Sequence, residues 1–167
     1  QGAKITNQAN TPVEILELEY PIRILEYSLV PNTEGAGRFR GGLAQKRVYQ
    51  YQQEGTEVRV RSDRRIQAPW GLKGGQNASP PKIMLKNRTN EKAMPGKFKL
   101  QVNPSDELTV QWCGGGGYGN PLDRDPTLVQ WDVLEEKVTR ERAFNIYGVE
   151  LDKKNRINRL ATKERRT

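Results

Sequence analysis

Two short stretches of the sequence carry residue types that could do chemistry. The first is a run of four glycines and a tyrosine: Gly114, Gly115, Gly116, Gly117 and Tyr118. Glycine allows positive φ and close backbone approach, and a glycine-rich turn before a helix can hold a phosphate. A P-loop, however, needs Lys-Ser/Thr after its last glycine, and Asn120-Pro121 follows here. Two interpretations remain: a close crossing of backbone segments, which we favour, and a contact with an anion or a partner.

The second stretch places an acid, two guanidinium groups and an indole on one loop: Asp63, Arg64, Arg65 and Trp70. Arginine binds carboxylate or phosphate, and tryptophan can stack on a flat ligand or on arginine. The same residues could instead form a structural clamp, with Asp63 paired to an arginine and Trp70 filling the β body. Arg38 and Arg40 flank Phe39 in a pattern that can hold nucleic acid, but no RNP, KH or zinc-finger motif accompanies them.

The residue types that are missing exclude much catalytic chemistry. The 167-residue chain has no histidine, so it cannot form a Ser-His-Asp triad, a histidine metal site or an imidazole base. Its single cysteine, Cys113, cannot build a disulfide framework or a cysteine zinc site, and we expect a buried, inert thiol. We therefore expect no catalytic residue, no metal ligand and no bound cofactor in this chain.

The net charge of +8 is unevenly distributed along the sequence. Residues 38–99 carry 15 basic and 4 acidic groups, and residues 152–167 carry 7 and 2. Both flanks of the basic centre are acidic. The centre could face a polyanion, or it could pair with those flanks inside the fold, which is the more common arrangement. Because the chain lacks an 18-residue apolar run and a signal pattern, we expect a cytoplasmic protein without a membrane span.

Hydrophobic periodicity predicts a mainly β (α+β) fold, in which an antiparallel body of short strands precedes a small carboxy-terminal helical hairpin. We expect residues 1–10 to be an extended lead-in or a cut end, residues 11–121 a β-rich domain, residues 122–151 the hairpin packed on it, and residues 152–167 a basic, flexible tail. Strands are predicted at 22–30, 43–53, 57–61, 83–86, 97–102 and 108–112. Glu54-Gly55-Thr56 predicts a β-hairpin between the second and third of these strands. A turn at 103–106 is expected to join the last two.

Apolar residues of the first strand and of the first carboxy-terminal helix are expected to be buried. In strand 22–30 both the even-numbered and the odd-numbered residues include apolar side chains, which predicts that other parts of the protein pack on both faces of the strand. Asp125-Pro126 predicts the start of a helix, and Thr139 and Gly148 bound a second one. The first helix carries an apolar stripe that we expect to pack on the β body: Leu128, Val129, Trp131, Val133 and Leu134.

Seven short motifs, taken together and in order, span about residues 7–151. They are Asn10-Thr11-Pro12-Val13-Glu14, Tyr20-Pro21, residues 35–42, Ser62-Asp63-Arg64-Arg65, residues 69–75, residues 114–121 and Tyr147-Gly148-Val149. In this order they resemble the carboxy-terminal part of the hydantoinase B/oxoprolinase family. That family includes parts of ATP-dependent 5-oxoprolinase, N-methylhydantoinase and related cyclic-amide hydrolases. Acetone and acetophenone carboxylase subunits are also similar to it.

The resemblance implies an ATP-driven hydrolase of which this chain is only a portion. Family members are several times longer, and their metal-binding acidic and histidine residues lie upstream of the matching part. ATP with Mg²⁺ and a divalent metal are thus implied for the full enzyme. The implied partners are the amino-terminal remainder of the same subunit and a hydantoinase A-type ATP-binding subunit or domain, in an oligomer. Because Gly2–Ile5 stands where the family commonly has a histidine, no family catalytic residue is assigned here.

Two functional hypotheses follow from the sequence. In the preferred one, the chain contributes a substrate-site wall or a subunit interface to a 5-oxoproline- or hydantoin-opening enzyme and is inactive alone. Its candidate residues are Arg38, Arg40, Asp63, Arg64, Arg65, Trp70, Gly114, Gly115, Gly116, Gly117 and Tyr118. The alternative is a free-standing polyanion- or nucleic-acid-binding module, against which the acidic flanks argue. If the glycine run is a tight crossing with positive φ, Gly116→Val should be severely destabilising.

Overall fold

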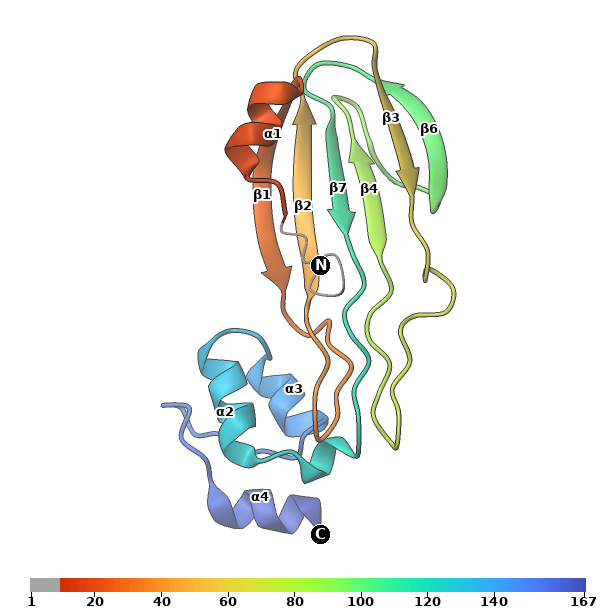
Figure 1. Ribbon diagram of the computed structural model, residues 1–167. Helices are drawn as coiled ribbons and strands as arrows, with labels where there is room; N and C mark the ends of the chain where they lie inside the picture. Colours follow the sequence, from red (N-terminus) through yellow and green to blue (C-terminus); the bar gives the residue numbers. More distant parts are fainter. Residues whose placement is uncertain (1–9) are drawn as a thin grey trace. The chain divides into compact units, whose positions relative to one another are not determined.

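The computed structural model describes residues 10–167 (Figure 1). Its elements are α1 (Val13–Glu19), β1 (Ile22–Val30), β2 (Ala44–Tyr51), β3 (Thr56–Arg61), β4 (Lys82–Lys86), β5 (Glu91–Ala93), β6 (Lys97–Val102), β7 (Glu107–Gln111), a 3₁₀ turn (Pro121–Asp123), α2 (Pro126–Leu134), α3 (Arg140–Asn145) and α4 (Arg159–Arg166). The lead-in expected at residues 1–10 lies, apart from Asn10, outside the described residues. Within residues 10–167, no helix is long and apolar enough to cross a membrane.

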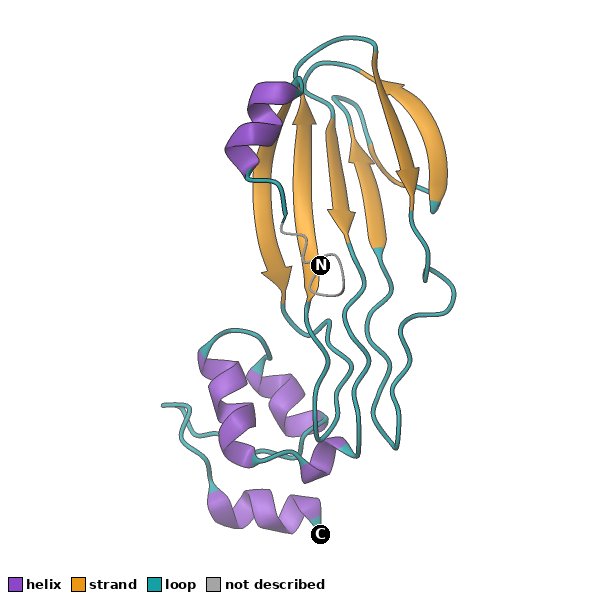
Figure 2. Cartoon of the chain, viewed as in Figure 1, coloured by secondary structure: helices purple, strands orange, loops and turns teal. Residues whose placement is uncertain are grey.

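The strands form two sheets (Figure 2), which confirms the mainly β fold with short antiparallel strands. The larger sheet has the order β1-β2-β7-β4-β5, and β3 pairs with β6 in a separate two-stranded sheet. The hairpin predicted between residues 43–53 and 57–61 is therefore wrong. The β3–β6 register explains why, since it places apolar side chains opposite each other: Val58 with Leu100 and Val60 with Phe98. The local turn at Gly55 (φ +71°) joins β2 and β3 without pairing them.

The chain divides into two compact units, and each is assembled from three separate segments. The first comprises the residues up to Tyr27, 47–61 and 83–109. It contains the predicted turn between β6 and β7, in which the Asn103 amide donates to Asp106 Oδ2 at 2.9 Å. Ser105 has φ +73° there. The local chemistry of an Asn-Pro-Ser-Asp turn is thus confirmed.

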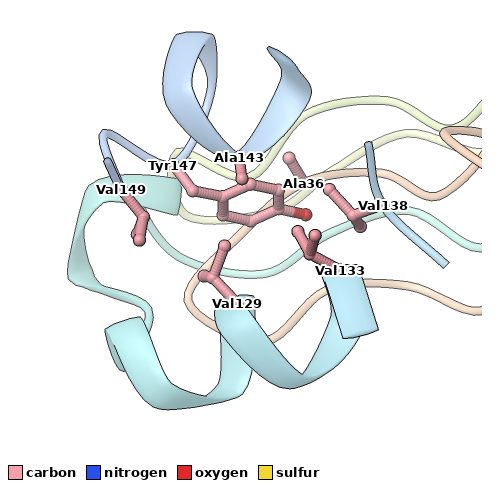
Figure 3. Close-up of a cluster of buried hydrophobic side chains, with 7 residues drawn as sticks. All are labelled: Ala36, Val129, Val133, Val138, Ala143, Tyr147 and Val149. Atoms are coloured by element: carbon pink, nitrogen blue, oxygen red, sulfur yellow. The ribbon is translucent and has the colours of Figure 1, made fainter. Parts of the chain in front are cut away.

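The second unit comprises residues 28–46, 62–82 and 110–167, and its core surrounds Tyr147 (Figure 3). The core residues are Ala36, Val129, Val133, Val138, Ala143, Tyr147 and Val149. α2 begins at a cap in which Asp125 accepts from the Thr127 amide at 2.8 Å. α3 is capped by Thr139 as predicted, and Gly148 follows it with φ +63°. Both helices line the Tyr147 ring with small aliphatic side chains (Figure 3).

Two expectations about apolar cover are wrong. On β1 the odd-numbered residues Leu25, Tyr27 and Leu29 are exposed, so the strand is not covered on both faces. On α2 only Val129 and Val133 of the expected stripe are buried. The other three members, at positions 128, 131 and 134, are about half exposed. The helix is apolar on both sides, and the pattern alone did not show which side packs.

Residues 152–167, where the sequence predicts a flexible tail, contain α4. Asn158 caps this helix by accepting from the Ala161 amide, and Thr162 is buried. The Arg166 guanidinium donates from Nε to the Tyr147 carbonyl at 2.9 Å and from Nη1 to the Arg124 carbonyl at 2.8 Å. These contacts tie α4 to the core of the second unit.

Candidate functional site

Three glycine-rich loop segments of the second unit lie against one another, and we call them the glycine crossing: residues 33–42, 69–79 and 113–119. Backbone hydrogen bonds join them. The Gly35 amide donates to the Gly115 carbonyl at 2.8 Å, and the Leu72 amide donates to the Gly117 carbonyl at 2.9 Å. The third segment, which holds the glycine run, therefore bonds to both of the others. Figure 2 shows the first two segments as long connections between strands and the third as the connection from the last strand to the helices.

The backbones of the crossing are too close for side chains between them. A Cβ on Gly116 would lie 1.9 Å from the Trp70 carbonyl oxygen, and one on Gly117 would lie 2.1 Å from that of Ala36. The structure shows the first of the two interpretations of the glycine run, a close crossing of backbone segments. Positive φ occurs at Gly119 (+74°) and not at Gly116, so the positive φ expected at Gly116 is wrong. Proximity of another backbone, rather than a left-handed conformation, excludes a side chain there.

Two amides of the glycine run, which alternate along it, are used within the crossing. Gly115 donates to the Gly42 carbonyl at 2.9 Å, and Gly117 donates to the Gln76 carbonyl at 3.0 Å. A phosphate cradle is formed by successive free amides that point at the anion. The run does not offer such a series, and we assign no ATP-dependent step to it. Within the described range, no group of three or more cysteine, aspartate or glutamate side chains could hold a metal ion.

The crossing presents four exposed side chains, Phe39, Trp70, Leu72 and Tyr118, which we call the apolar face. Tyr118 forms isolated β-bridges with Phe39 and with Leu72. The Phe39 and Tyr118 rings are 6.4 Å apart at 44°. Trp70 precedes Leu72 by two residues, the spacing that returns a side chain to the same side of an extended segment. The four side chains are 48–61% exposed, so Trp70 does not fill the β body.

Two of the arginines predicted as site residues lie over rings of this face. The Arg64 guanidinium carbon is 4.8 Å from the Trp70 ring centroid, and that of Arg38 is 5.6 Å from the Phe39 ring. Arg64 has φ +63°, a left-handed conformation that is strained for a side chain with a Cβ. Asp63 is exposed beside it. The structure thus brings Arg38, Arg64, Trp70 and Tyr118 together around the crossing.

Arg40 has a different role from Arg38. Its Nε donates to Asp132 Oδ2 at 2.9 Å and its Nη2 to Asp132 Oδ1 at 2.7 Å. Arg124 Nη2 donates to the same carboxylate at 2.9 Å. The hydrogen bonds to Asp132 raise the pKa of the Arg40 guanidinium above its ordinary value. Arg40 is committed to joining the crossing to α2 and is not available for an external ligand.

A second buried acid joins the crossing to α3. Glu34 Oε1 accepts from Arg142 Nε at 2.7 Å and from the Tyr147 hydroxyl at 3.1 Å. Burial, and then the nearby Glu34 charge, raise the pKa of the Tyr147 hydroxyl. Glu34 and Asp132 could not be identified from the sequence, because Arg142 and Arg40, which bind them, lie about one hundred positions away in the chain. Cys113, expected to be buried, is a half-buried free thiol.

A family model described as Hydantoinase B/oxoprolinase matches residues 2–121 of the chain. The match contains all three segments of the glycine crossing and ends before α2. The motifs on which the resemblance rested include these same segments.

Similar curated and solved proteins are much longer than this chain. An uncharacterized protein of Methanocaldococcus jannaschii is 37% identical over 87% of this chain and 26% of its own length. A putative D-/L-hydantoinase B-type subunit of Pseudomonas sp. (strain NS671) is 35% identical over 96% of this chain and 27% of its own. The crystal structure of the ATP-dependent caprolactamase from Pseudomonas jessenii aligns with a TM-score of 0.78 at 29% identity, covering 94% of this chain and 28% of that chain. This chain therefore spans about a quarter of the length of these relatives.

Proposed function

The chain belongs to the hydantoinase B/oxoprolinase family, and we propose that it is the carboxy-terminal portion of a hydantoinase B-type subunit of an ATP-dependent cyclic-amide hydrolase. In this role it contributes a wall of the substrate site or a subunit interface. The reaction centre lies in other parts of the enzyme. The substrate class is a cyclic amide such as 5-oxoproline, a hydantoin or another lactam.

The observation that carries this proposal is the glycine crossing with its apolar face. Three segments are held by backbone hydrogen bonds, and four large apolar side chains project from them into solvent. Such a platform is suited to contact rather than to bond cleavage, because no group of three or more metal-ligating side chains accompanies it among residues 10–167 and the sequence has no histidine to act as an imidazole base. The two neighbouring acids, Glu34 and Asp132, are buried and paired with arginines.

The proposal implies components outside this chain. ATP with Mg²⁺, and a divalent metal, act in the full enzyme at sites supplied by other parts. The amino-terminal remainder of the same subunit and a hydantoinase A-type ATP-binding subunit or domain are the expected partners in a cytoplasmic oligomer. The names of the hydantoinase relative and of the ATP-dependent caprolactamase support this assignment.

The test is ATP-dependent hydrolysis of 5-oxoproline, hydantoin and caprolactam, measured as coupled ADP release and ring opening. We expect residues 1–167 alone to be inactive, and activity to require the amino-terminal remainder and a hydantoinase A-type partner. Hydrolysis by residues 1–167 alone would overturn the proposal. Within the active complex, Trp70→Ala distinguishes the two roles: a substrate-site wall predicts a higher KM in an intact complex, whereas an interface predicts loss of assembly. Trp131→Ala, on α2, is the matched control.

A further inference from the structure

We propose that the apolar face, together with Arg38 and Arg64, is a docking surface for an acidic protein segment that carries apolar side chains and belongs to the same subunit outside residues 1–167. This inference rests on the proposed function and makes the contact role more specific. It assigns the face to a contact inside the subunit rather than to the substrate.

The composition of the face is that of a protein interface. Its four apolar members are large, they are each about half exposed or more, and three are aromatic. Contiguous exposed apolar groups of this kind mark interaction surfaces, and tryptophan, tyrosine and arginine are enriched where binding energy concentrates. Two arginines lie over two of the three aromatic rings.

The exposure of the face favours a macromolecule over a small cyclic amide, because its four apolar side chains are 48–61% exposed. Small ligands bind in concave pockets that cover most of their surface. Two cavities lined by described residues, of about 390 Å³ and about 450 Å³, include no residue of the face. The bridged segments beneath the face are also fixed by backbone hydrogen bonds. Docking onto them therefore costs little conformational entropy.

Charge indicates an acidic occupant. The exposed charged side chains on the segments that carry the face are Arg38 and Lys73, and residues 63–64 beside the face add Arg64 and one acid, Asp63. Arg40 and Glu34 do not alter this balance, because each is paired with an oppositely charged partner within the second unit. Complementary charge across an interface selects the partner and its orientation.

The length of the similar proteins supports placing this occupant in the same polypeptide. All residues of the face fall inside residues 2–121, which the family model matches. In the relatives compared above, about three quarters of the polypeptide lies outside the part that this chain matches. In a polypeptide of that length, the remainder of the same chain is the nearest available partner for the face.

Trp131 on α2 provides an internal control for the test. Trp70 and Trp131 are 56% and 58% exposed in this structure, so an uncovered face predicts similar labelling of both. Trp131 lies outside residues 2–121 and is not part of the face. The full-length protein that carries this sequence is labelled with hydroxyl radicals, and oxidation of each tryptophan is quantified by mass spectrometry.

We expect Trp70 to be oxidised roughly tenfold more slowly than Trp131, because interface cores exclude water. Arg64→Glu should raise Trp70 labelling several-fold by repelling the acidic occupant, whereas Arg88→Glu, at an exposed turn of the first unit, should not. Equal labelling of the two tryptophans would overturn the inference. So would protection of Trp70 that disappears on dilution, because the occupant would then be a second copy. This readout does not require activity, so a protected Trp70 in a protein that opens no cyclic amide would contradict only the proposed function.

Discussion

Gly116→Ala adds one methyl group at one of the closest points of the glycine crossing. Its Cβ would lie 1.9 Å from the carbonyl oxygen of Trp70 and 2.6 Å from its carbonyl carbon, whereas ordinary contact begins at 3.4 Å. The two backbones would have to separate by roughly 1.5 Å, the difference between 3.4 and 1.9 Å. Neither atom is the end of a flexible side chain, so the overlap cannot be relieved by a rotamer change.

The cost has two parts. Overpacking of this kind costs about 1–3 kcal/mol. Separation also stretches the hydrogen bonds from Leu72 to Gly117 and from Gly117 to Gln76, which contribute about 1 kcal/mol each. We therefore expect the free energy of unfolding to fall by about 3–5 kcal/mol. At about 2–4 °C per kcal/mol for a chain of this size, Tm should fall by roughly 10 °C.

Two other glycines provide graded controls. A Cβ on Gly42 meets no atom within 4 Å, and a Cβ on Gly115 comes no closer than 3.0 Å to a neighbour. Gly42→Ala should change stability by no more than about 0.5 kcal/mol, and Gly115→Ala should lie between the two. Urea unfolding followed by far-UV circular dichroism gives the three midpoints. Equal midpoints for Gly116→Ala and Gly42→Ala would refute the explanation of the run as a close crossing.

The remaining predictions concern the charged network and the apolar face. Arg40→Ala should lower the free energy of unfolding by about 2 kcal/mol, because the buried Asp132 loses two hydrogen bonds from Arg40 and keeps that from Arg124. Arg38→Ala, at an exposed position, should cost less than about 0.5 kcal/mol; equal losses in thermal denaturation would contradict this assignment. Tyr147→Phe should cost about 1 kcal/mol near neutral pH, because the hydroxyl no longer donates to Glu34. Since the folded-state pKa of Tyr147 is raised, its contribution is complete below pH 10 and declines above it, so in the phenylalanine variant Tm should fall less steeply above pH 10. A Tm profile that is as steep as that of the parent chain would show that Tyr147 does not titrate in this way. Finally, Trp70→Ala and Trp131→Ala should each change stability by less than about 1 kcal/mol, and only the former should weaken association of residues 1–167 with the separately produced amino-terminal remainder of the subunit in size-exclusion chromatography; a matching loss in Trp131→Ala would count against a specific face.

Features with a local chemical signal could be predicted from the sequence. The cap at Thr139, the turn at 103–106 and the bounds of β6 depend on residues a few positions apart, and the structure has all three. Strand pairing depends on distant partners, so β3 was assigned to the wrong neighbour although its own range was nearly right. The same distinction between local and distant contacts applies to the candidate site. Arg38 and Arg40 are indistinguishable in sequence, and only the distant Asp132 separates an exposed arginine from a structural one.

The glycine crossing and the apolar face have a common geometric origin. Because three backbones lie within contact of one another, the side chains of their other residues must project away from the crossing. At Phe39, Trp70, Leu72 and Tyr118 this outward position is exposed to solvent, where a polar side chain would serve stability equally well. The crossing thus explains why side chains stand outward at these positions, but it does not explain why they are large and apolar. A contact with another surface explains why these side chains are large and apolar. Substitutions in the glycine run should therefore affect stability, whereas substitutions in the apolar face should affect assembly.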